Sequence, residues 1–264
     1  MAATDTLRTT NSADGTKIAV DVSGSGPAIV LISGGSVDRG SNAGLAAALQ
    51  GSFTVYNFDR RGRGDSGDTA PYAVEREIED VAAVIALAGG HAHLYGSSSG
   101  AGLALEAAAA GVPVDKLVLW EPPYAVDPAL RPPADSVEQL DRLVAEGRRG
   151  DAAAYFMADM VRLPAEFVGF ARTQPWWAAQ EALAHTLAYD ARVMGDYSVP
   201  VDKAARIAAP TLILTGSASF ALFKPTAEAL ASAIPDARSA VLEGQEHNVD
   251  PAKLGPAMVA FLAD

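Results

Sequence analysis

The segment HLYGSSSGAGLALEAA (93–108) constrains the fold most, because an apolar strand meets a helix there across five small residues. The apolar run before the turn suits a buried strand, and the small and apolar residues after it suit a packed helix. A turn this tight leaves no room for side chains at its flanks, and glycine occupies both, as Gly96 and Gly100. The segment therefore predicts a strand–turn–helix unit with Ser98 at the exposed apex and a free backbone N–H group at Ser99.

Segments typical of strands and helices alternate along most of the chain. The predicted strands are 28–32, 53–58, 92–95, 116–120, 211–215 and 239–242, and the predicted helices are 43–50, 75–87, 99–110, 225–233 and 251–262. Before them, residues 7–11 and 17–22 are predicted to form a hairpin around the Asp14-Gly15 turn. Strands that alternate with helices of this length imply an α/β fold: a mostly parallel, doubly wound sheet with helices on both faces.

The alternation stops between about residues 124 and 200, where the chain is helix-prone and strand-poor. Helices are predicted there at 137–146, 151–161, 166–173 and 177–187. Because the sheet resumes afterwards, we interpret this segment as a helical cap inserted over the carboxyl edge of the sheet. The expected division is a core of residues 1–124 and 200–264 and a cap of residues 125–199.

The motif G-x-S-x-G between a strand and a helix matches the nucleophile elbow of the α/β-hydrolase superfamily, and the chain resembles that superfamily over its full length. The resemblance implies an α/β-hydrolase fold with Ser98 as the nucleophile. It also implies that the loop after strand 28–32 provides an oxyanion-stabilising amide, at Gly35, alongside the amide of Ser99. Ser33 stands where the superfamily often has a histidine that is not catalytic.

The segment FDRRGRGDS (58–66) resembles the D-x-R-G-x-G-x-S loop of the same superfamily. We expect it to be a structural loop with glycine hinges, tied by hydrogen bonds of Asp59 and Arg61. A binding role for Arg63 stays open.

A general base for Ser98 is expected among the four histidines of the chain. His247 follows the last predicted strand and precedes the last helix, which is where the superfamily keeps this base. An imidazole with an ordinary pKa near about 6.5 accepts the serine proton and returns it to the leaving group. His91 and His93 lie at the far end of the elbow strand and His185 lies in the cap, so structural or surface roles are expected for them.

The acid that would orient the histidine is missing from its usual place. In the superfamily it follows strand 211–215, but the turn Gly216-Ser217-Ala218-Ser219 contains no carboxylate. The preceding strand of the sheet, 116–120, ends in Glu121, at an edge position that faces the same crevice. We therefore predict Glu121 as the acid, since a glutamate is long enough to reach across from a neighbouring strand.

Two prolines, Pro122 and Pro123, stiffen the loop behind Glu121, and Pro122 is expected to hold Glu121 in an extended backbone. Asp127 and Asp250 are weaker candidates for the acid. With a glutamate in this role, the chain resembles small bacterial α/β-hydrolases that carry E-P-P-Y after the same strand. It also resembles, more distantly, the zearalenone-type lactonases in its elbow, its glutamate and its turn of small residues.

The composition argues against several other classes of protein. A net charge of −12 and a pI near 4.7 argue against nucleic acid or an anionic membrane as partners. The absence of cysteine excludes disulfides, thiolate metal sites and a cysteine nucleophile, and the histidines lack the spacing of metal ligands. The first ten residues contain no apolar signal segment, so a cytoplasmic protein is expected. No metal is expected, and the serine chemistry implied by the resemblance needs no cofactor.

The motifs and the resemblance to α/β-hydrolases predict a serine hydrolase that cleaves a carboxylic ester or lactone, with Ser98 as nucleophile, His247 as base and Glu121 as acid. The aromatic residues expected to line an apolar pocket between cap and sheet are Trp120, Trp176, Trp177 and Phe220. Two alternatives stay open: non-hydrolytic chemistry, as in a cyanohydrin lyase or a cofactor-free perhydrolase, and a degenerate member that only binds a ligand. The sequence leaves open which small molecule is the substrate and whether the chain forms a homo-oligomer.

Overall fold

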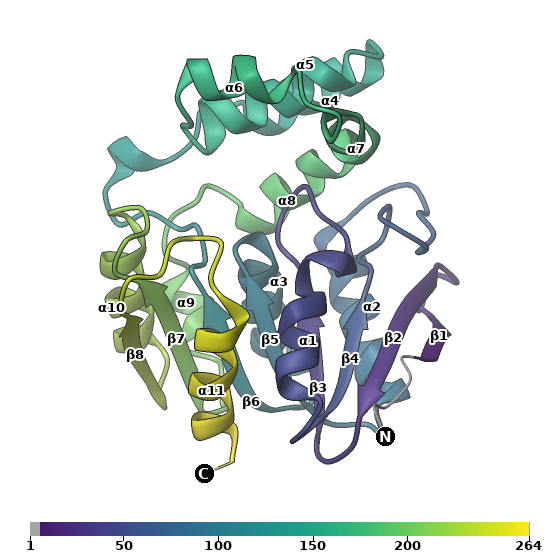
Figure 1. Ribbon diagram of the computed structural model, residues 1–264, viewed down its shortest axis with the longest axis vertical. Coiled ribbons are helices and arrows are strands. Elements are labelled where there is room, and N and C mark those ends of the chain that lie inside the picture. Colours follow the sequence, from purple (N-terminus) through teal and green to yellow (C-terminus); the bar gives the residue numbers. More distant parts are fainter. Residues whose placement is uncertain (1–5, 264) are drawn as a thin grey trace.

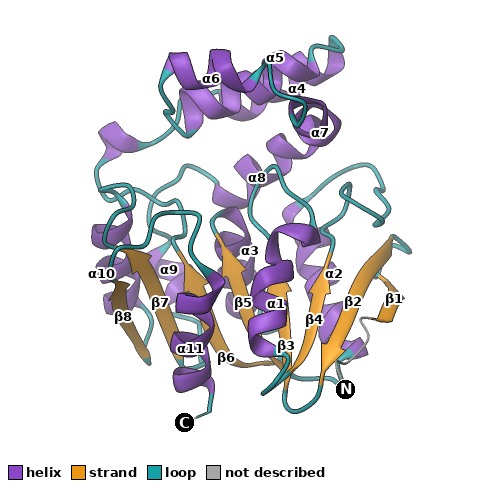
Figure 2. Cartoon of the chain, in the orientation of Figure 1, coloured by secondary structure: helices purple, strands orange, loops and turns teal. Residues whose placement is uncertain are grey.

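The computed structural model describes residues 6–263, and its centre is an eight-stranded sheet in the order β1-β2-β4-β3-β5-β6-β7-β8 (Figure 1, Figure 2). The strands are β1 (Thr6–Asn11), β2 (Lys17–Gly24), β3 (Ala28–Ile32), β4 (Thr54–Phe58), β5 (Ala92–Ser97), β6 (Val114–Trp120), β7 (Thr211–Gly216) and β8 (Ala237–Leu242). Strand β2 is antiparallel to β1 and β4, and every other neighbouring pair is parallel. The predicted mostly parallel α/β sheet is confirmed.

Helices cover both faces of the sheet, because side chains along each strand alternate between two hydrophobic cores. In β3, Val30 and Ile32 pack in one core, whereas Ile29 and Leu31 pack in the other. The first core is covered by α2 (Val74–Leu87), α3 (Ser99–Ala109) and α10 (Phe223–Ala233), and the second by α1 (Ala43–Leu49) and α11 (Pro251–Leu262). In Figure 1, α1 and α11 lie in front of the sheet, so the sheet is doubly wound.

The segment between β6 and β7 contains helices but no strand. Its helices are α4 (Ser136–Ala145), α5 (Arg149–Tyr155), α6 (Ala165–Ala171), α7 (Trp177–Leu183), α8 (Leu187–Met194) and the short α9 (Val201–Ala204). In Figure 1, α4 to α7 form a layer above the carboxyl ends of the parallel strands, and α8 leads from this layer back toward the sheet. The division into a core and a cap of residues 125–199 remains a prediction.

Two differences from the predicted helices affect the candidate site. The helix predicted at 151–161 is divided in the structure. Its first part belongs to α5, which ends at Tyr155, and its second part is a π-helical stretch, Phe156–Met160, that lines a cavity described below. The prediction also missed α8 as a separate helix. This helix packs on α3 so closely that a Cβ on Gly102 would lie 2.5 Å from Sδ of Met194.

Candidate active site

The turn between β5 and α3 holds Ser98 in a strained backbone, with φ 54° and ψ −125°. A Cβ on Gly96 would collide with the carbonyl oxygen of Gly100, and a Cβ on Gly100 would collide with that of Ser33. The backbone N–H of Ser98 donates to the carbonyl oxygen of Trp120 in β6 (2.8 Å). Glycine is therefore required on both sides of Ser98, and the neighbouring strand holds the turn in place.

His247 and Glu121 are hydrogen-bonded to each other, although 126 residues separate them in the chain. Nδ1 of His247 lies 2.6 Å from Oε2 of Glu121, whose side chain is fully buried, while the histidine side chain is 30% exposed. Phe223 stacks on the imidazole, with ring centroids 5.0 Å apart and the planes 3° from parallel. In addition, Nε1 of Trp120 donates to the carbonyl oxygen of His247 (2.9 Å). These contacts fix the position and the orientation of the imidazole.

The turn of small residues after β7 binds the carboxylate of Glu121. The N–H of Gly216 donates to Oε1 of Glu121 (2.8 Å), and the hydroxyl of Ser219 donates to Oε2 (2.8 Å). Together with His247, these donors satisfy a carboxylate that is shielded from solvent. The turn that lacks a carboxylate thus supplies hydrogen bonds to a carboxylate from the neighbouring strand.

The backbone of Glu121 is not extended, contrary to the expectation based on Pro122. Its φ is 45°, in the left-handed region, where a non-glycine residue costs about 1–3 kcal/mol. Its N–H donates to the carbonyl oxygen of Leu214 in β7 (3.1 Å), and this bond and those of the side chain outweigh the bias of the proline. The weaker acid candidates have another role, since Asp127 and Asp250 each cap the N-terminus of a helix.

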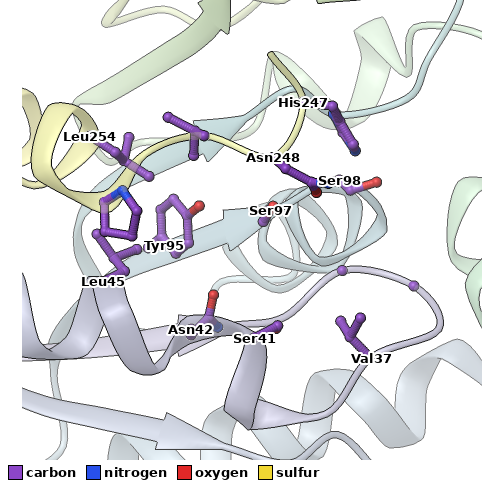
Figure 3. A pocket seen from close by; sticks show the side chains of 14 residues that line it. Val37, Ser41, Asn42, Leu45, Tyr95, Ser97, Ser98, His247, Asn248 and Leu254 are labelled. Atoms are coloured by element: carbon purple, nitrogen blue, oxygen red, sulfur yellow. The ribbon is translucent and has the colours of Figure 1, made fainter. Parts of the chain in front are cut away.

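Ser98 and His247 line two adjoining cavities. The first, of about 380 Å³, lies between the sheet and the helices that follow β6, and we call it the cap cavity. The second cavity, of about 390 Å³, lies between α1 and the loop that leads into α11 (Figure 3). In Figure 3, Ser98 and His247 lie together at one end of it. The residues that line both cavities are Gly35, Val37, Ser98, His247 and Asn248.

Two of the four aromatic residues predicted to line an apolar pocket do line the cap cavity: Trp176 and Phe220. Trp177 instead packs in a small core among the helices after β6, where its Nε1 donates to Glu181 (2.9 Å). Trp120 is fully buried in the core next to β7. Trp177 lines neither cavity, so the structure does not support a substrate contact by this residue. Adjacent residues of a helix point about 100° apart, which is why Trp176 and Trp177 have different surroundings.

Arg63 supports the loop after β3, which carries Gly35, the predicted oxyanion donor. Its guanidinium is buried, and Nη1 donates to the carbonyl oxygens of Gly34 (2.5 Å) and Val37 (3.2 Å), on either side of Gly35. A Cβ on Gly35 would lie 3.1 Å from Oδ2 of Asp190, which is a tight approach. Arg63 is not among the residues that line the two cavities, so the binding role left open for it has no support.

Asp190, in α8, connects this loop to the residue that follows the nucleophile. Its Oδ1 accepts hydrogen bonds from Arg63 Nη2 (2.8 Å), Arg60 Nη1 (2.7 Å) and Ser99 Oγ (2.8 Å). Glu77 accepts two further bonds from Arg60, of 2.7 and 2.8 Å. Burial alone would raise the pKa of Asp190, but the Arg63 and Arg60 guanidinium groups lower it below its ordinary value. An ionised Asp190 therefore ties α8 to both sides of the predicted oxyanion site.

The loop after β4 is held by the two residues named for this role from the sequence. Arg61 pairs with Asp80 (2.8 Å) and Asp14 (2.9 Å). Asp59 is fully buried and accepts a hydrogen bond from the backbone N–H of Arg39 (2.8 Å). These contacts agree with a structural role for the loop.

The remaining histidines do not line either cavity. His91 is exposed, and His93 is buried at the start of β5, where burial lowers its pKa. His185 lies before α8 with Nδ1 3.1 Å from a backbone carbonyl oxygen. These positions fit structural or surface roles for all three.

Residues 6–263 show neither a metal cluster nor a membrane-spanning helix. These residues hold no group of three or more His, Cys, Asp or Glu side chains placed to bind a metal ion. Within the same range, no helix combines the length and the apolar character needed to cross a bilayer.

Comparison with known proteins identifies the family. Residues 29–253, most of the chain, match the Alpha/beta hydrolase family. The chain belongs to this family. An alpha/beta hydrolase from Sphaerobacter thermophilus DSM 20745 has a similar solved structure, with 52% sequence identity and a TM-score of 0.91. That match covers 97% of this chain and 100% of the other.

More distant proteins with solved structures share the fold. An esterase from Thermogutta terrifontis is 21% identical, with a TM-score of 0.77 and 98% of both chains covered. An enol-lactonase from Burkholderia xenovorans LB400 is 22% identical, with a TM-score of 0.73, over 95% of this chain and 98% of the other.

A partial sequence match links the chain to the hydrolase YraK of Bacillus subtilis (strain 168). The two are 35% identical over 96 residues, so the match spans only 35% of the length of each protein.

Proposed function

We propose that this alpha/beta hydrolase is a serine hydrolase that cleaves a carboxylic ester or a lactone through Ser98, His247 and Glu121. The observation that carries the proposal is the 2.6 Å hydrogen bond between Nδ1 of His247 and the buried carboxylate of Glu121, which other donors hold in place. A carboxylate at Nδ1 selects the tautomer with the proton on that nitrogen, so Nε2 is left to act as the base. This is the arrangement that a serine nucleophile requires.

The first half-reaction transfers the acyl group to the enzyme. Oγ of Ser98 attacks the carbonyl carbon while Nε2 of His247 takes the hydroxyl proton. The electron pair of the C=O bond moves to the oxygen, and the amides of Gly35 and Ser99 donate to this oxyanion, each worth about 10²–10³ in rate. The C=O bond then re-forms, the bond to the leaving oxygen breaks, and His247 gives its proton to that oxygen. Glu121 stabilises the imidazolium formed in between.

The second half-reaction releases the acid. A water molecule attacks the acyl carbonyl carbon and loses a proton to Nε2 of His247. The same two amides stabilise the oxyanion, and its collapse breaks the bond to Oγ of Ser98. His247 returns the proton to Ser98, which restores the free enzyme. All steps use side chains and amides of this chain together with water.

The lining of the cap cavity supports an uncharged substrate with an apolar part. Its apolar wall includes Leu130, Phe156, Met160, Phe167, Trp176 and Phe220. Among the described residues that line it, Asp190 carries the only fixed charge, and that charge is negative. A carboxylate on the substrate would lose its hydration there without gaining a counter-ion. We therefore favour neutral esters or lactones.

Hydrolysis of p-nitrophenyl acetate and p-nitrophenyl butyrate by the purified protein tests the proposal. We expect turnover by the wild type, loss to background in Ser98→Ala, and labelling of Ser98 by a fluorophosphonate probe, located by mass spectrometry. Ser232→Ala is the matched control, because it removes an exposed serine of α10 and should keep full activity. A wild type that is inert to esters, lactones and the probe would overturn the proposal and favour a protein that only binds a ligand.

Non-hydrolytic chemistry at the same site has its own assays. Release of an aldehyde and cyanide from cyanohydrins would indicate a lyase, and formation of peracetate from acetate and hydrogen peroxide would indicate a perhydrolase. If either rate exceeded the ester hydrolysis rate, the hydrolase proposal would be wrong. We expect ester hydrolysis to be fastest.

A further inference from the structure

The second cavity differs from the cap cavity in the chemistry of its wall. Besides aliphatic side chains, it is lined by neutral polar residues, namely Ser41, Asn42, Tyr95, Ser97 and Asn248. None of the described residues in its lining is Asp, Glu, Lys or Arg. A group that fills this cavity therefore meets hydrogen-bonding partners without meeting a fixed charge.

Polar atoms of this wall have hydrogen-bonding capacity left for a ligand. Asn42 is buried, and its Nδ2 donates to Asn57 at 3.5 Å, whereas its oxygen points into the cavity in Figure 3. Burial raises the pKa of the Tyr95 hydroxyl, despite its hydrogen bond with Ser97, so this hydroxyl stays neutral. An acceptor and a neutral hydroxyl in one cavity suit an alcohol, because each hydroxyl group both donates and accepts.

The position of the cavity indicates which part of an ester would enter it. One of its walls is formed by Asn248 and Val249, in the loop that leads from His247 into α11, and by Pro251, the first residue of α11. The leaving oxygen must lie beside Nε2 of His247, because this nitrogen protonates it. A leaving group that extends along this loop fills the second cavity. Because Ser98 lines both cavities, the acyl chain of the same ester then extends into the apolar cap cavity.

We infer that the second cavity binds the alcohol part of the substrate, and that this part is small, uncharged and hydroxyl-bearing, such as the alcohol of a polyol ester. The inference rests on the proposed ester hydrolysis and adds the chemical class of the leaving group. An apolar alcohol of the same size would leave the polar atoms of the wall unpaired. The enzyme should therefore discriminate between esters by their alcohol even when the acyl group is identical.

Two butyrate esters test this discrimination. We expect kcat/KM for 2,3-dihydroxypropyl butyrate to exceed that for pentyl butyrate at least about tenfold, since a site with hydrogen-bonding groups rejects ligands that leave them unpaired. Ser41→Leu places an aliphatic side chain in the second cavity and should remove this preference. Methyl butyrate has a one-carbon alcohol without hydroxyl groups, so wild type and Ser41→Leu should differ least on this ester. An unchanged circular dichroism spectrum shows that the variant is folded. Phe167→Ala, in the cap cavity, is the matched control and should slow both larger esters without changing their ratio.

Saturation-transfer NMR on Ser98→Ala gives a readout that does not need turnover. Magnetisation should reach the glyceryl protons of intact 2,3-dihydroxypropyl butyrate, and adding Ser41→Leu should remove this transfer while the butyryl protons keep theirs. If the wild type hydrolyses both larger esters equally well and Ser41→Leu changes nothing, the inference is overturned while ester hydrolysis stands. If the glyceryl contact is seen without any wild-type turnover, the proposed hydrolysis fails and the assignment of the cavity stands.

Discussion

Asp190→Ala should destabilise the protein strongly, because Asp190 is the counter-ion of two buried guanidinium groups. Its side chain is 2% exposed, and Oδ1 accepts from Arg60 at 2.7 Å and from Arg63 at 2.8 Å. After the substitution, Arg60 keeps its ion pair with Glu77, whereas Arg63 loses its ion-pair partner and keeps hydrogen bonds to backbone carbonyl groups. One buried positive charge is then left without compensation.

The size of the effect follows from this stranded charge. Removing one partner of a buried ion pair costs about 3–5 kcal/mol. For a domain of this size, one kcal/mol corresponds to about 2–4 °C in Tm, so the Tm should fall by about 6–20 °C. Asp141→Ala is the matched control, because it removes a carboxylate of α4 that pairs with Arg192 and is 50% exposed. An exposed pair contributes at most about 1 kcal/mol, so this variant should lose no more than about 4 °C.

The pH dependence provides a second check on Asp190. Burial would raise its pKa, but Arg63 and Arg60 lower it in the folded protein. A lowered folded-state pKa contributes stability above the ordinary aspartate value of about 3.9, and this stability is lost as the pH falls through the lower value. The Tm difference between wild type and Asp190→Ala should thus stay constant between about pH 5 and pH 8 and shrink below about pH 4. Thermal unfolding followed by circular dichroism measures both effects, and equal Tm losses in Asp190→Ala and Asp141→Ala would refute the reasoning.

Three further predictions concern the site and its substrate. Glu121→Ala should lower kcat for a p-nitrophenyl ester by on the order of 10³–10⁴-fold, while its circular dichroism spectrum stays unchanged. A loss below about tenfold would mean that another group orients His247. Ser219→Ala removes a 2.8 Å hydrogen bond to the Glu121 carboxylate, so urea unfolding should report a loss of about 1.5–3 kcal/mol. Ser217→Ala is its control, because it breaks only exposed bonds, one to Glu243 and one from the N–H of Gly244; equal losses in the two serine variants would contradict the prediction. Mono-p-nitrophenyl glutarate should have a kcat/KM at least about tenfold below that of p-nitrophenyl valerate. The described residues in the wall of the cap cavity include no cation to pair with the glutarate carboxylate. Equal values would argue against binding of the acyl group in the cap cavity.

The sheet and the elbow could be predicted because short-range patterns encode them. The central strands β3, β6 and β7 contain apolar runs. Gly96 and Gly100 are forced by steric contacts within one turn and with the adjacent strand. The proximity of Glu121 to His247 could also be predicted, since it needs only the order of parallel strands in the sheet. Both predictions depend on the backbone path and not on how side chains pack.

Asp190 could not be predicted, because its partners lie far away in the chain: Arg63 is 127 residues distant and Arg60 is 130 residues distant. Nothing local distinguishes it from an exposed helix residue. The available signal was the number of arginines in the loop after β4, since buried guanidinium groups require carboxylate partners. The different environments of Trp176 and Trp177 were equally hidden, because only packing decides which side of a helix faces the cavity.

The turn after β7 can consist of small residues because the acid comes from the end of the neighbouring strand β6. Strands β6 and β7 are parallel neighbours that pair Trp120 with Leu214, so their ends meet at one edge of the sheet. A carboxylate at position 219 would stand beside that of Glu121, and two neighbouring like charges repel. Serine there instead donates a hydrogen bond that the carboxylate needs. The hydrogen bonds of the Glu121 carboxylate offset the backbone strain at this residue. A turn after β7 without an acid therefore does not mean that the imidazole lacks a carboxylate partner.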